Sequence, residues 1–235
     1  MAEQICTVCE VCEVCEVCEA TSALATAGTH VASTDEMTGI QALERLHPSL
    51  PIQPGHVERE ECEYERHGTL SLIANVEVAT GQVIAPSRGP TRTEADFAAH
   101  IAQTIQTDPH AGSIFITDQR NTHQSEPLVR LVAAQCGIQE ELGSKGKSGH
   151  LASMSTRAAF LSDPRHRMRF VYTPKHTSWL NQIEIWFSLL VRRLLARAGW
   201  GSVAHVRQGI LAFIPYYNRL SNGPFHWTYK GPSRT

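Results

Sequence analysis

Ser113-Ile114-Phe115-Ile116-Thr117-Asp118 is a continuous apolar run that ends in an aspartate. An unbroken run of this length, without alternation of polar and apolar residues, is typical of a strand buried on both faces of a sheet. A carboxylate that follows such a strand lies at the rim of the sheet, where the sites of α/β proteins tend to form. The segment therefore predicts an α/β fold and makes Asp118 a candidate site residue.

Two further strands are expected upstream of this run. Residues 30–35 predict a short strand that delivers Asp35 at its end, and residues 69–78 alternate as a longer strand does. The turn at 79–81 returns the chain into 82–85, which we expect to pair as a hairpin partner. A second aspartate thus follows a strand of the same predicted sheet.

The rest of the chain alternates between helical and strand patterns. The expected elements are a helix N-capped by Thr93, a helix through 128–132, a strand at 168–172, a helix from Thr177 or Ser178, and a helix over about 203–217. Residues 137–162 are polar and glycine-rich, and we interpret them as an insertion with some helix. The pattern predicts one α/β domain over residues 28–235, with a mixed sheet flanked by helices.

The composition is that of an ordinary globular protein, with 235 residues, 42% hydrophobic and 19% charged. It excludes disordered and fibrous chains and is large enough for one substantial core. No apolar run approaches the roughly 20 residues that span a bilayer, and the N-terminus is acidic rather than basic. We therefore expect a cytoplasmic protein with no membrane partner.

The charge is distributed unevenly along the chain. Residues 1–163 hold 10 Lys and Arg against 22 Asp and Glu, whereas residues 164–235 hold 11 against one, Glu184. A segment this basic attracts a polyanion such as nucleic acid, although pairing between the two halves is an alternative. The lone acid in the basic half favours the first interpretation.

Glu184 lies in the helical pattern of residues 178–190, with apolar Leu180 and Phe187 at i−4 and i+3. Its carboxylate is therefore expected to border the buried stripe, where it must be protonated, paired with a cation or bound to metal. Together with Asp35 and Asp118, it favours a divalent cation. Two Mg²⁺ ions about 4 Å apart are a known arrangement for in-line phosphoryl transfer.

Five cysteines recur every third residue near the N-terminus, at positions Cys6, Cys9, Cys12, Cys15 and Cys18. Zinc and iron–sulfur sites use such pairs, but their ligands are spaced less uniformly, and the adjacent glutamates disfavour the thiolate. We interpret residues 1–27 as a low-complexity tail and linker, with a metal site as the alternative.

Four ordered blocks of the sequence resemble one known family. They are STDEMTGIQALER (33–45), FITDQRNTHQS (115–125), VYTPKHTSWLNQIEIWF (171–187), and YYNR (216–219) with PFHWTYKG (224–231). The blocks resemble the catalytic domain of bacterial transposases of the insertion sequence 630 family, in the mariner superfamily. The resemblance covers about residue 28 to the C-terminus.

This resemblance implies a ribonuclease H-like fold in which Asp35, Asp118 and Glu184 are the catalytic, metal-binding triad. It implies two Mg²⁺ or Mn²⁺ ions, hydrolysis of a DNA phosphodiester at the transposon end, and attack of the freed 3′-hydroxyl on target DNA. DNA is then the main partner. Self-association, or a partner transposase product that carries a helix-turn-helix module, is a further expectation.

Supporting roles follow for seven more residues, which are Asn121, His123, Lys175, His176, Asn181, Arg192 and Arg193. Asn121 and His123 are candidates to bind phosphate or to hold Asp118, with helix capping as the alternative. Lys175 and His176 are placed to meet DNA phosphates, and Asn181 matches the motif. The two arginines suit either the C-terminal end of a helix or a phosphate contact.

The chain also departs from the family pattern. We expect no helix-turn-helix module ahead of residue 28. Gln119 stands where many relatives have Asn, and Glu184 follows Asp118 by 66 positions. We assign the long spacing to the insertion at 137–162. The alternative function is a non-catalytic transposase fragment that binds DNA or full-length transposase and regulates transposition. A metal or redox protein built on the cysteines, or a general ribonuclease H or resolvase, are weaker alternatives.

Overall fold

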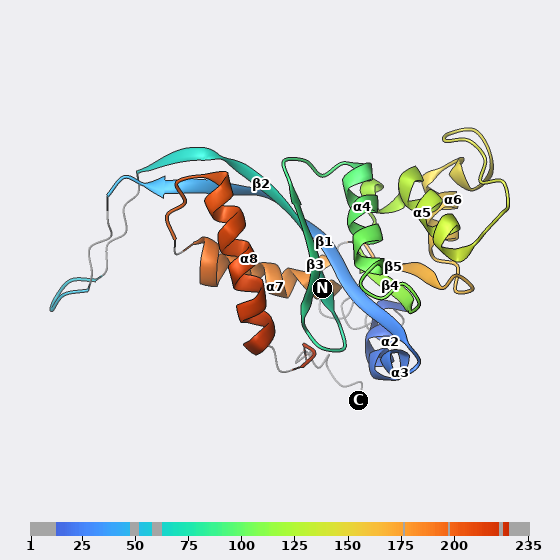
Figure 1. The fold of residues 1–235 in the computed structure, drawn as a ribbon, viewed down its shortest axis with the longest axis horizontal. Helices are drawn as coiled ribbons and strands as arrows, with labels where there is room; N and C mark the ends of the chain where they lie inside the picture. Colours follow the sequence, from blue (N-terminus) through green and yellow to red (C-terminus); the bar gives the residue numbers. More distant parts are fainter. Residues whose placement is uncertain are drawn as a thin grey trace, which may run out of the picture.

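A computed structural model describes residues 13–47, 52–57, 63–175, 177–196, 198–220 and 223–225. Five strands form one sheet in the order β3-β2-β1-β4-β5 (Figure 1). Their bounds are β1 Thr29–Arg45, β2 Tyr64–Glu77, β3 Val83–Gly89, β4 Gly112–Thr117 and β5 Met168–Tyr172. Strand β2 is antiparallel to β1 and β3, whereas β4 is parallel to β1 and β5. The predicted mixed sheet is confirmed.

Helices pack on both faces of this sheet. The α-helices are α2 Glu13–Glu19, α3 Thr21–Thr26, α4 Glu94–Ile105, α5 Glu126–Cys136, α6 Met154–Leu161, α7 Ile183–Leu190 and α8 Val203–Leu220. Shorter helical turns are η1 Asn121–Gln124, η2 Gly149–Leu151, η3 Ser178–Leu180 and the π-helical η4 Val191–Leu195. The α/β class is therefore confirmed, and none of the described helices is long and apolar enough to cross a membrane.

Alternation along the strands separates the core into two sides. On one side Ala32, Phe115 and Phe170 pack against α4, α5 and α6. On the other side, the long β1–β2 ribbon packs against α7 and α8, where Trp186 is fully buried. Figure 1 shows β1 and β2 running on together past the other strands, with α8 beside them. The sheet thus carries α7 beside β1 and β2.

Several predicted boundaries match the structure. The strand at 168–172 is exact, and β4 is shifted by one residue from the predicted run. Thr93 caps α4 in a capping box, in which the Asp96 amide donates to its hydroxyl at 3.2 Å. The polar region 137–162 contains η2 and α6, so the expectation of some helix there is confirmed.

The first strand was expected to end at Asp35, and this prediction is wrong. Strand β1 continues to Arg45 because it pairs with β2 from Ala32↔Glu77 to Arg45↔Tyr64. Its parallel pairing with β4 stops at Ser33, whereas its pairing with β2 continues past Asp35. Asp35 therefore lies at the rim of the sheet on the β4 side of the strand and not on the β2 side. The polar run around Asp35 looks like a turn, and long-range pairing overrides that local preference.

The predicted helix from Thr177 or Ser178 is broken into two parts. Turn η3 ends at Leu180, Asn181 is extended with φ −80° and ψ 105°, and α7 begins at Ile183. The break is stabilised by strand β1, because the Ile183 amide donates to the Ser33 hydroxyl at 2.9 Å. The last helix, predicted over about 203–217, extends to Leu220.

The described part of the cysteine repeat, Glu13–Glu19, forms helix α2. The period of three places Val14 and Val17 on one helical face, and both are buried against Val31 and Ile116 of the sheet. Cys6, Cys9 and Cys12 lie outside the described residues. The boundary at residue 28 between a tail and the catalytic domain stays a prediction.

We expect Val17→Asp to lower the free energy of unfolding by about 2 kcal/mol or more, because it places a charge where the native side chain is only 6% exposed. Urea denaturation followed by circular dichroism measures the change. The control is Glu16→Asn on the exposed face of the same helix. Equal denaturation midpoints for the two variants would show that α2 does not pack on the sheet.

Candidate active site

Asp35 and Asp118 are brought together by the register of two neighbouring parallel strands. Ser33 pairs with Ile116, so the two aspartates stand two residues beyond the same pair. Asp118 follows the last residue of β4, as predicted. The two carboxylates are close enough for the charge of Asp118 to raise the pKa of Asp35. The rim of the sheet therefore presents a carboxylate pair.

Asp35 is the more buried of the two, with 3% of its surface exposed. Burial raises its pKa to about 6, and the positive charge of His123 opposes this rise. The Glu36 amide donates to its Oδ1 at 2.7 Å, and the Asn181 side chain donates to its Oδ2 at 3.4 Å. At neutral pH the Asp35 carboxylate is therefore held in one orientation, and its ionisation destabilises the fold.

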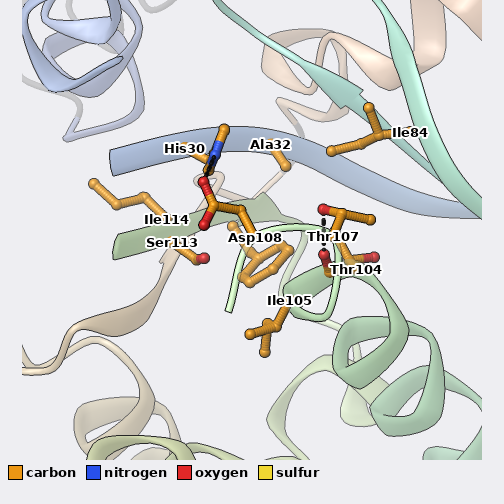
Figure 2. A pocket seen from close by; sticks show the side chains of 10 residues that line it. His30, Ala32, Ile84, Thr104, Ile105, Thr107, Asp108, Ser113 and Ile114 are labelled. Atoms are coloured by element: carbon orange, nitrogen blue, oxygen red, sulfur yellow. Dashed lines mark hydrogen bonds and ion pairs between the residues drawn. The ribbon is translucent and has the colours of Figure 1, made fainter. Parts of the chain in front are cut away.

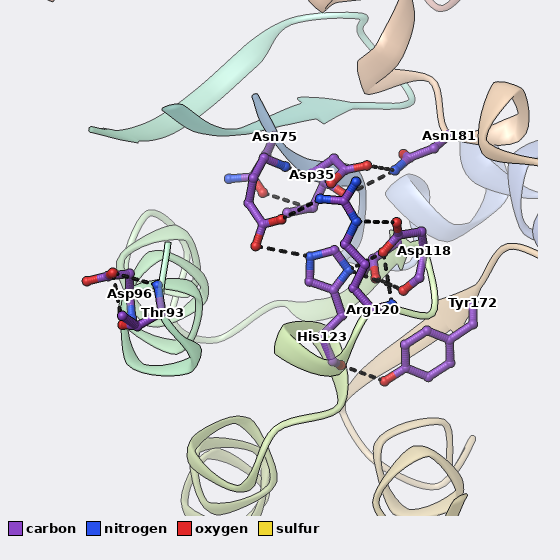
Figure 3. A network of polar contacts seen from close by, with 12 residues as sticks. Asp35, Asn75, Thr93, Asp96, Asp118, Arg120, His123, Tyr172 and Asn181 are labelled. Carbon is purple, nitrogen blue, oxygen red and sulfur yellow. Dashed lines mark hydrogen bonds and ion pairs between the residues drawn. The ribbon is translucent and has the colours of Figure 1, made fainter. Parts of the chain in front are cut away.

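Asn181 connects β1 to the start of α7 and is completely buried. Its amide nitrogen donates to the Thr34 carbonyl oxygen at 3.1 Å, and its amide oxygen accepts from the Ser33 hydroxyl. Figure 3 shows its side chain directed at Asp35. The residue thus lies at the site, where it fixes both an aspartate and the helix that carries Glu184.

Glu184 occupies the first turn of α7 and is exposed. Its expected apolar neighbours Leu180 and Phe187 are both buried, but only Phe187 shares α7 with Glu184, because Leu180 belongs to η3. Partial burial still raises the pKa of Glu184, while the charge of Arg120 lowers it and that of Asp118 raises it. The third predicted acid therefore lies within electrostatic reach of the second.

His123, in η1, is packed behind Asp118 with a fully buried side chain. Its Nδ1 is 2.7 Å from Asp118 Oδ1, and its Nε2 is 3.4 Å from Glu36 Oε1. Burial alone would lower its pKa, but the two carboxylates raise the pKa of His123 to about 9. The Tyr172 hydroxyl donates to the His123 carbonyl oxygen at 2.9 Å, which holds the turn in place.

Two charged residues of the cluster were missed in the sequence analysis, namely Arg120 and Glu36. Arg120 Nε is 3.0 Å from Asp118 Oδ2 (Figure 3), and its Nη1 is 3.5 Å from Glu36 Oε2. Burial would raise the pKa of Asp118, yet His123 and Arg120 outweigh it, so its pKa lies below the ordinary value. Glu36 follows Asp35 within a strand, where neighbours face opposite sides, so no spacing rule pointed to it.

The remaining candidates are more dispersed. Asn121 and Lys175 are exposed at the start of η1 and after β5. Arg192 and Arg193 are exposed on η4, and Arg192 lines an open groove together with Glu184. His176 lies outside the described residues. The groove therefore joins an acidic end at the rim to a basic end on η4.

The donor set fits a hard divalent cation. Asp35, Glu36 and His123 offer ligand atoms within 4.8 Å of one another, while Asp118 and Glu184 stand outside this group. Both ring nitrogens of His123 face carboxylates and its pKa is raised to about 9, so the carboxylates are the donors. Mg²⁺ and Mn²⁺ prefer carboxylate oxygens, which predominate here. A pocket elsewhere, between β1, β4 and α4, is lined by apolar and polar residues in equal number, and His30 and Asp108 are among the polar ones (Figure 2). It contains none of the predicted site residues.

Residues 30–207, which include all three predicted acids, match the model of the family described as DDE superfamily endonuclease. The chain belongs to this family. Its membership agrees with the carboxylates gathered at the rim of the sheet. The sequence matches none of the curated proteins with which it was compared.

Solved structures of the Mos1 mariner transposase share the fold of this DDE-family chain. The Mos1 mariner paired-end complex with Mn matches with a TM-score of 0.50 and 10% identity, over 86% of this chain and 53% of that chain. The Mos1 transposase paired-end complex with the left transposon end matches with a TM-score of 0.49 and 11% identity, over 88% of this chain and 56% of that chain. The chain thus spans about half the length of the solved chains that it matches.

We expect Asp35→Asn to stabilise the protein in a pH-dependent way. The folded-state pKa of about 6 lies above the unfolded value, so ionisation of Asp35 costs stability as pH rises from about 4 to about 6. Without metal, the variant should therefore gain about 2 to 3 kcal/mol over the native protein at pH 8 and little at pH 4. Urea unfolding in EDTA at both pH values measures this.

The control is Asp96→Asn in the α4 capping box, where hydrogen bonds from Thr93 and Thr91 lower the pKa of the carboxyl. Its effect must have the opposite sign, since ionised Asp96 stabilises the fold and this contribution is lost as pH falls. A pH-independent effect of Asp35→Asn would contradict the assignment of Asp35 as a buried, ionised carboxylate.

Proposed function

We propose that this chain is the catalytic domain of a bacterial DNA transposase of the insertion sequence 630 family, in the mariner superfamily. The observation that supports it most is the shared register of Asp35 and Asp118, with Glu184 beside them on α7. The proposed reaction hydrolyses a DNA phosphodiester at the transposon end and then joins the 3′-hydroxyl to target DNA. Catalysis is assigned to Asp35, Asp118 and Glu184.

The same three carboxylates are proposed to hold Mg²⁺ or Mn²⁺, as two ions. When bound, such ions act as Lewis acids on the phosphate and lower the pKa of a coordinated water. Within the protein, Asn181 orients Asp35 and His123 orients Asp118 through the contacts described above. Arg120, with 48% of its side chain exposed, can offer N–H donors to a phosphate oxygen.

The proposed DNA path follows the open groove from the acids to η4. Arg192 and Arg193 on η4, together with Lys175, supply exposed positive charge for the phosphate backbone. His176 is assigned to the same path from the sequence alone. Exposed basic residues of the C-terminal half thus lie beside the acidic rim, which supports DNA as their proposed partner.

The proposed domain covers residues 28–235, with 137–162 as an insertion and residues 1–27 as a separate tail. The proposed partners are transposon ends, target DNA, a second copy, or a transposase product with a helix-turn-helix module. The protein would act in the bacterial cytoplasm, where its DNA lies. The second candidate is a non-catalytic transposase fragment that binds DNA or full-length transposase and regulates transposition.

Purified protein is expected to nick supercoiled plasmid in Mg²⁺ or Mn²⁺ and not in EDTA. Asp118→Ala and Glu184→Ala should each reduce the nicking rate at least about 100-fold. Each variant removes a carboxylate proposed to hold the metal ions, which would stabilise the charge that develops in the transition state. Gel electrophoresis measures the rate, with Glu126→Ala on α5 as the control, since the Glu126 carboxylate pairs with Arg130. Salt-sensitive DNA binding without nicking would instead support the regulatory fragment.

The proposed DNA path predicts a change in salt dependence. Arg192→Gln together with Arg193→Gln should reduce the slope of log binding constant against log salt by about 2, since each phosphate contact contributes about 0.9. Fluorescence anisotropy with a duplex oligonucleotide at several salt concentrations measures the slope. An unchanged slope would remove η4 from the DNA path, and Arg130→Gln on α5 serves as the control.

A further inference from the structure

We propose that Glu36 is a positioning residue for the cutting reaction and that it orients Asp118 through His123. The inference rests on the proposed function, in which Asp118 is a catalytic carboxylate. It adds a fourth acid to the site, one that lies behind the reacting groups.

The burial of Glu36 is the first observation. Its side chain is 1% exposed, and its Oε1 has no aligned hydrogen bond. A carboxylate removed from water in this way is destabilising unless cations compensate it. Its ionic contacts within the described residues are His123 at 3.4 Å and Arg120 at 3.5 Å. The Glu36 backbone is paired with β2, but its carboxylate is held by His123 and Arg120.

The second observation is that both groups also contact Asp118. His123 Nδ1 is 2.7 Å from Asp118 Oδ1, and Arg120 Nε is 3.0 Å from Asp118 Oδ2. Each cation thus bridges the same two carboxylates, one at each oxygen of Asp118. Such paired contacts fix the rotation of a carboxylate as well as its position.

The third observation is that His123 is rigid. Its side chain is fully buried, its ring lies 4.3 Å from the Phe97 ring, and the Tyr172 hydroxyl holds its carbonyl oxygen. A ring that donates from Nδ1 to Asp118 presents Nε2 to Glu36, so the two carboxylates set its orientation together. Asp118, with 22% of its side chain exposed, is the outer end of this chain of contacts.

Glu36 acts on Asp118 through contacts with His123 and Arg120, so its loss should be felt at Asp118. Glu36 also lines the groove of the proposed DNA path, but its side chain is only 1% exposed, so we expect little effect on DNA affinity. Without its charge, His123 and Arg120 lose the inner carboxylate, and Asp118 is free to rotate. Residues that hold a metal-binding side chain in place typically contribute 10- to 100-fold to metal affinity or activity. In a protein that lacks His123, substitution of Glu36 should have no further effect on nicking or Mn²⁺ affinity, because His123 is the main link between Glu36 and Asp118.

The test is a double-mutant cycle with Glu36→Gln, His123→Asn and the double variant. Three quantities are measured on the full chain: the plasmid nicking rate at saturating Mn²⁺, the affinity for a DNA duplex, and Mn²⁺ affinity by calorimetry without DNA. The matched control for the nicking rate is Glu44→Gln, since Glu44 also lies on β1 and contacts a histidine, His67, at 2.7 Å. It is not used in calorimetry, because Glu44, Glu65 and His67 could hold an ion of their own.

We expect Glu36→Gln to slow nicking and to weaken Mn²⁺ binding by about 10- to 100-fold, with DNA affinity changed less than twofold. The double variant should be no slower than the slower single variant, and Glu44→Gln should match the native protein. Partial recovery in Glu36→Asp, which restores a carboxylate, supports the same conclusion.

Three results would overturn the inference. Multiplying effects in the double variant would show that Glu36 acts independently of His123. Loss of one bound Mn²⁺ equivalent would make Glu36 a direct ligand, and an equal effect of Glu44→Gln would make the change non-specific. If Glu36→Gln does not fold, Glu36→Asp takes its place in the cycle with the same criteria.

The calorimetric measurement separates this inference from the proposed function. If the native protein binds Mn²⁺ but does not nick DNA, the proposed function fails while the cycle on Mn²⁺ affinity still decides the role of Glu36. If nicking is present and the cycle is additive, the inference fails alone.

Discussion

The parallel pairing of β1 with β4 is the constraint on which the rest of the site depends. It fixes Ser33 opposite Ile116 and so sets Asp35 and Asp118 at equivalent positions beyond the last shared pair. A shift by one residue would turn one of the two side chains to the other face of the sheet. The hydrophobic faces on both sides of these strands make such a shift costly, since Phe115 and Ile116 are packed against opposite layers.

The carboxylates gathered at this rim are compatible with folding because two basic side chains, Arg120 and His123, lie among them. Arg120 and His123 contact the carboxylates of Asp118 and Glu36, and their charge partly offsets the burial of Asp35. The offset is incomplete, as the raised pKa of Asp35 shows. A site that keeps destabilising charge in this way is typical of function, because stability alone would favour its removal.

Local patterns were sufficient for much of the fold. The apolar run of β4, the alternation of β5 and the cap at Thr93 each act over a few residues, so the sequence predicted them closely. The length of β1 could not be read locally, because its second half is a strand only through pairing with β2. The break at Asn181 was missed for the same reason, since hydrogen bonds from β1 stabilise it.

By itself, the sequence determined the α/β class, the order of the elements and the three acids that stand near strand or helix ends. These follow from periodicity and from chain order, which are properties of neighbouring residues. Only the tertiary structure decided that Glu184 is exposed, that Val14 and Val17 of the cysteine repeat enter the core, and that Glu36 lies behind Asp118. Those facts depend on contacts between residues far apart in the chain, because such contacts decide which side chains are buried and which charges lie close together.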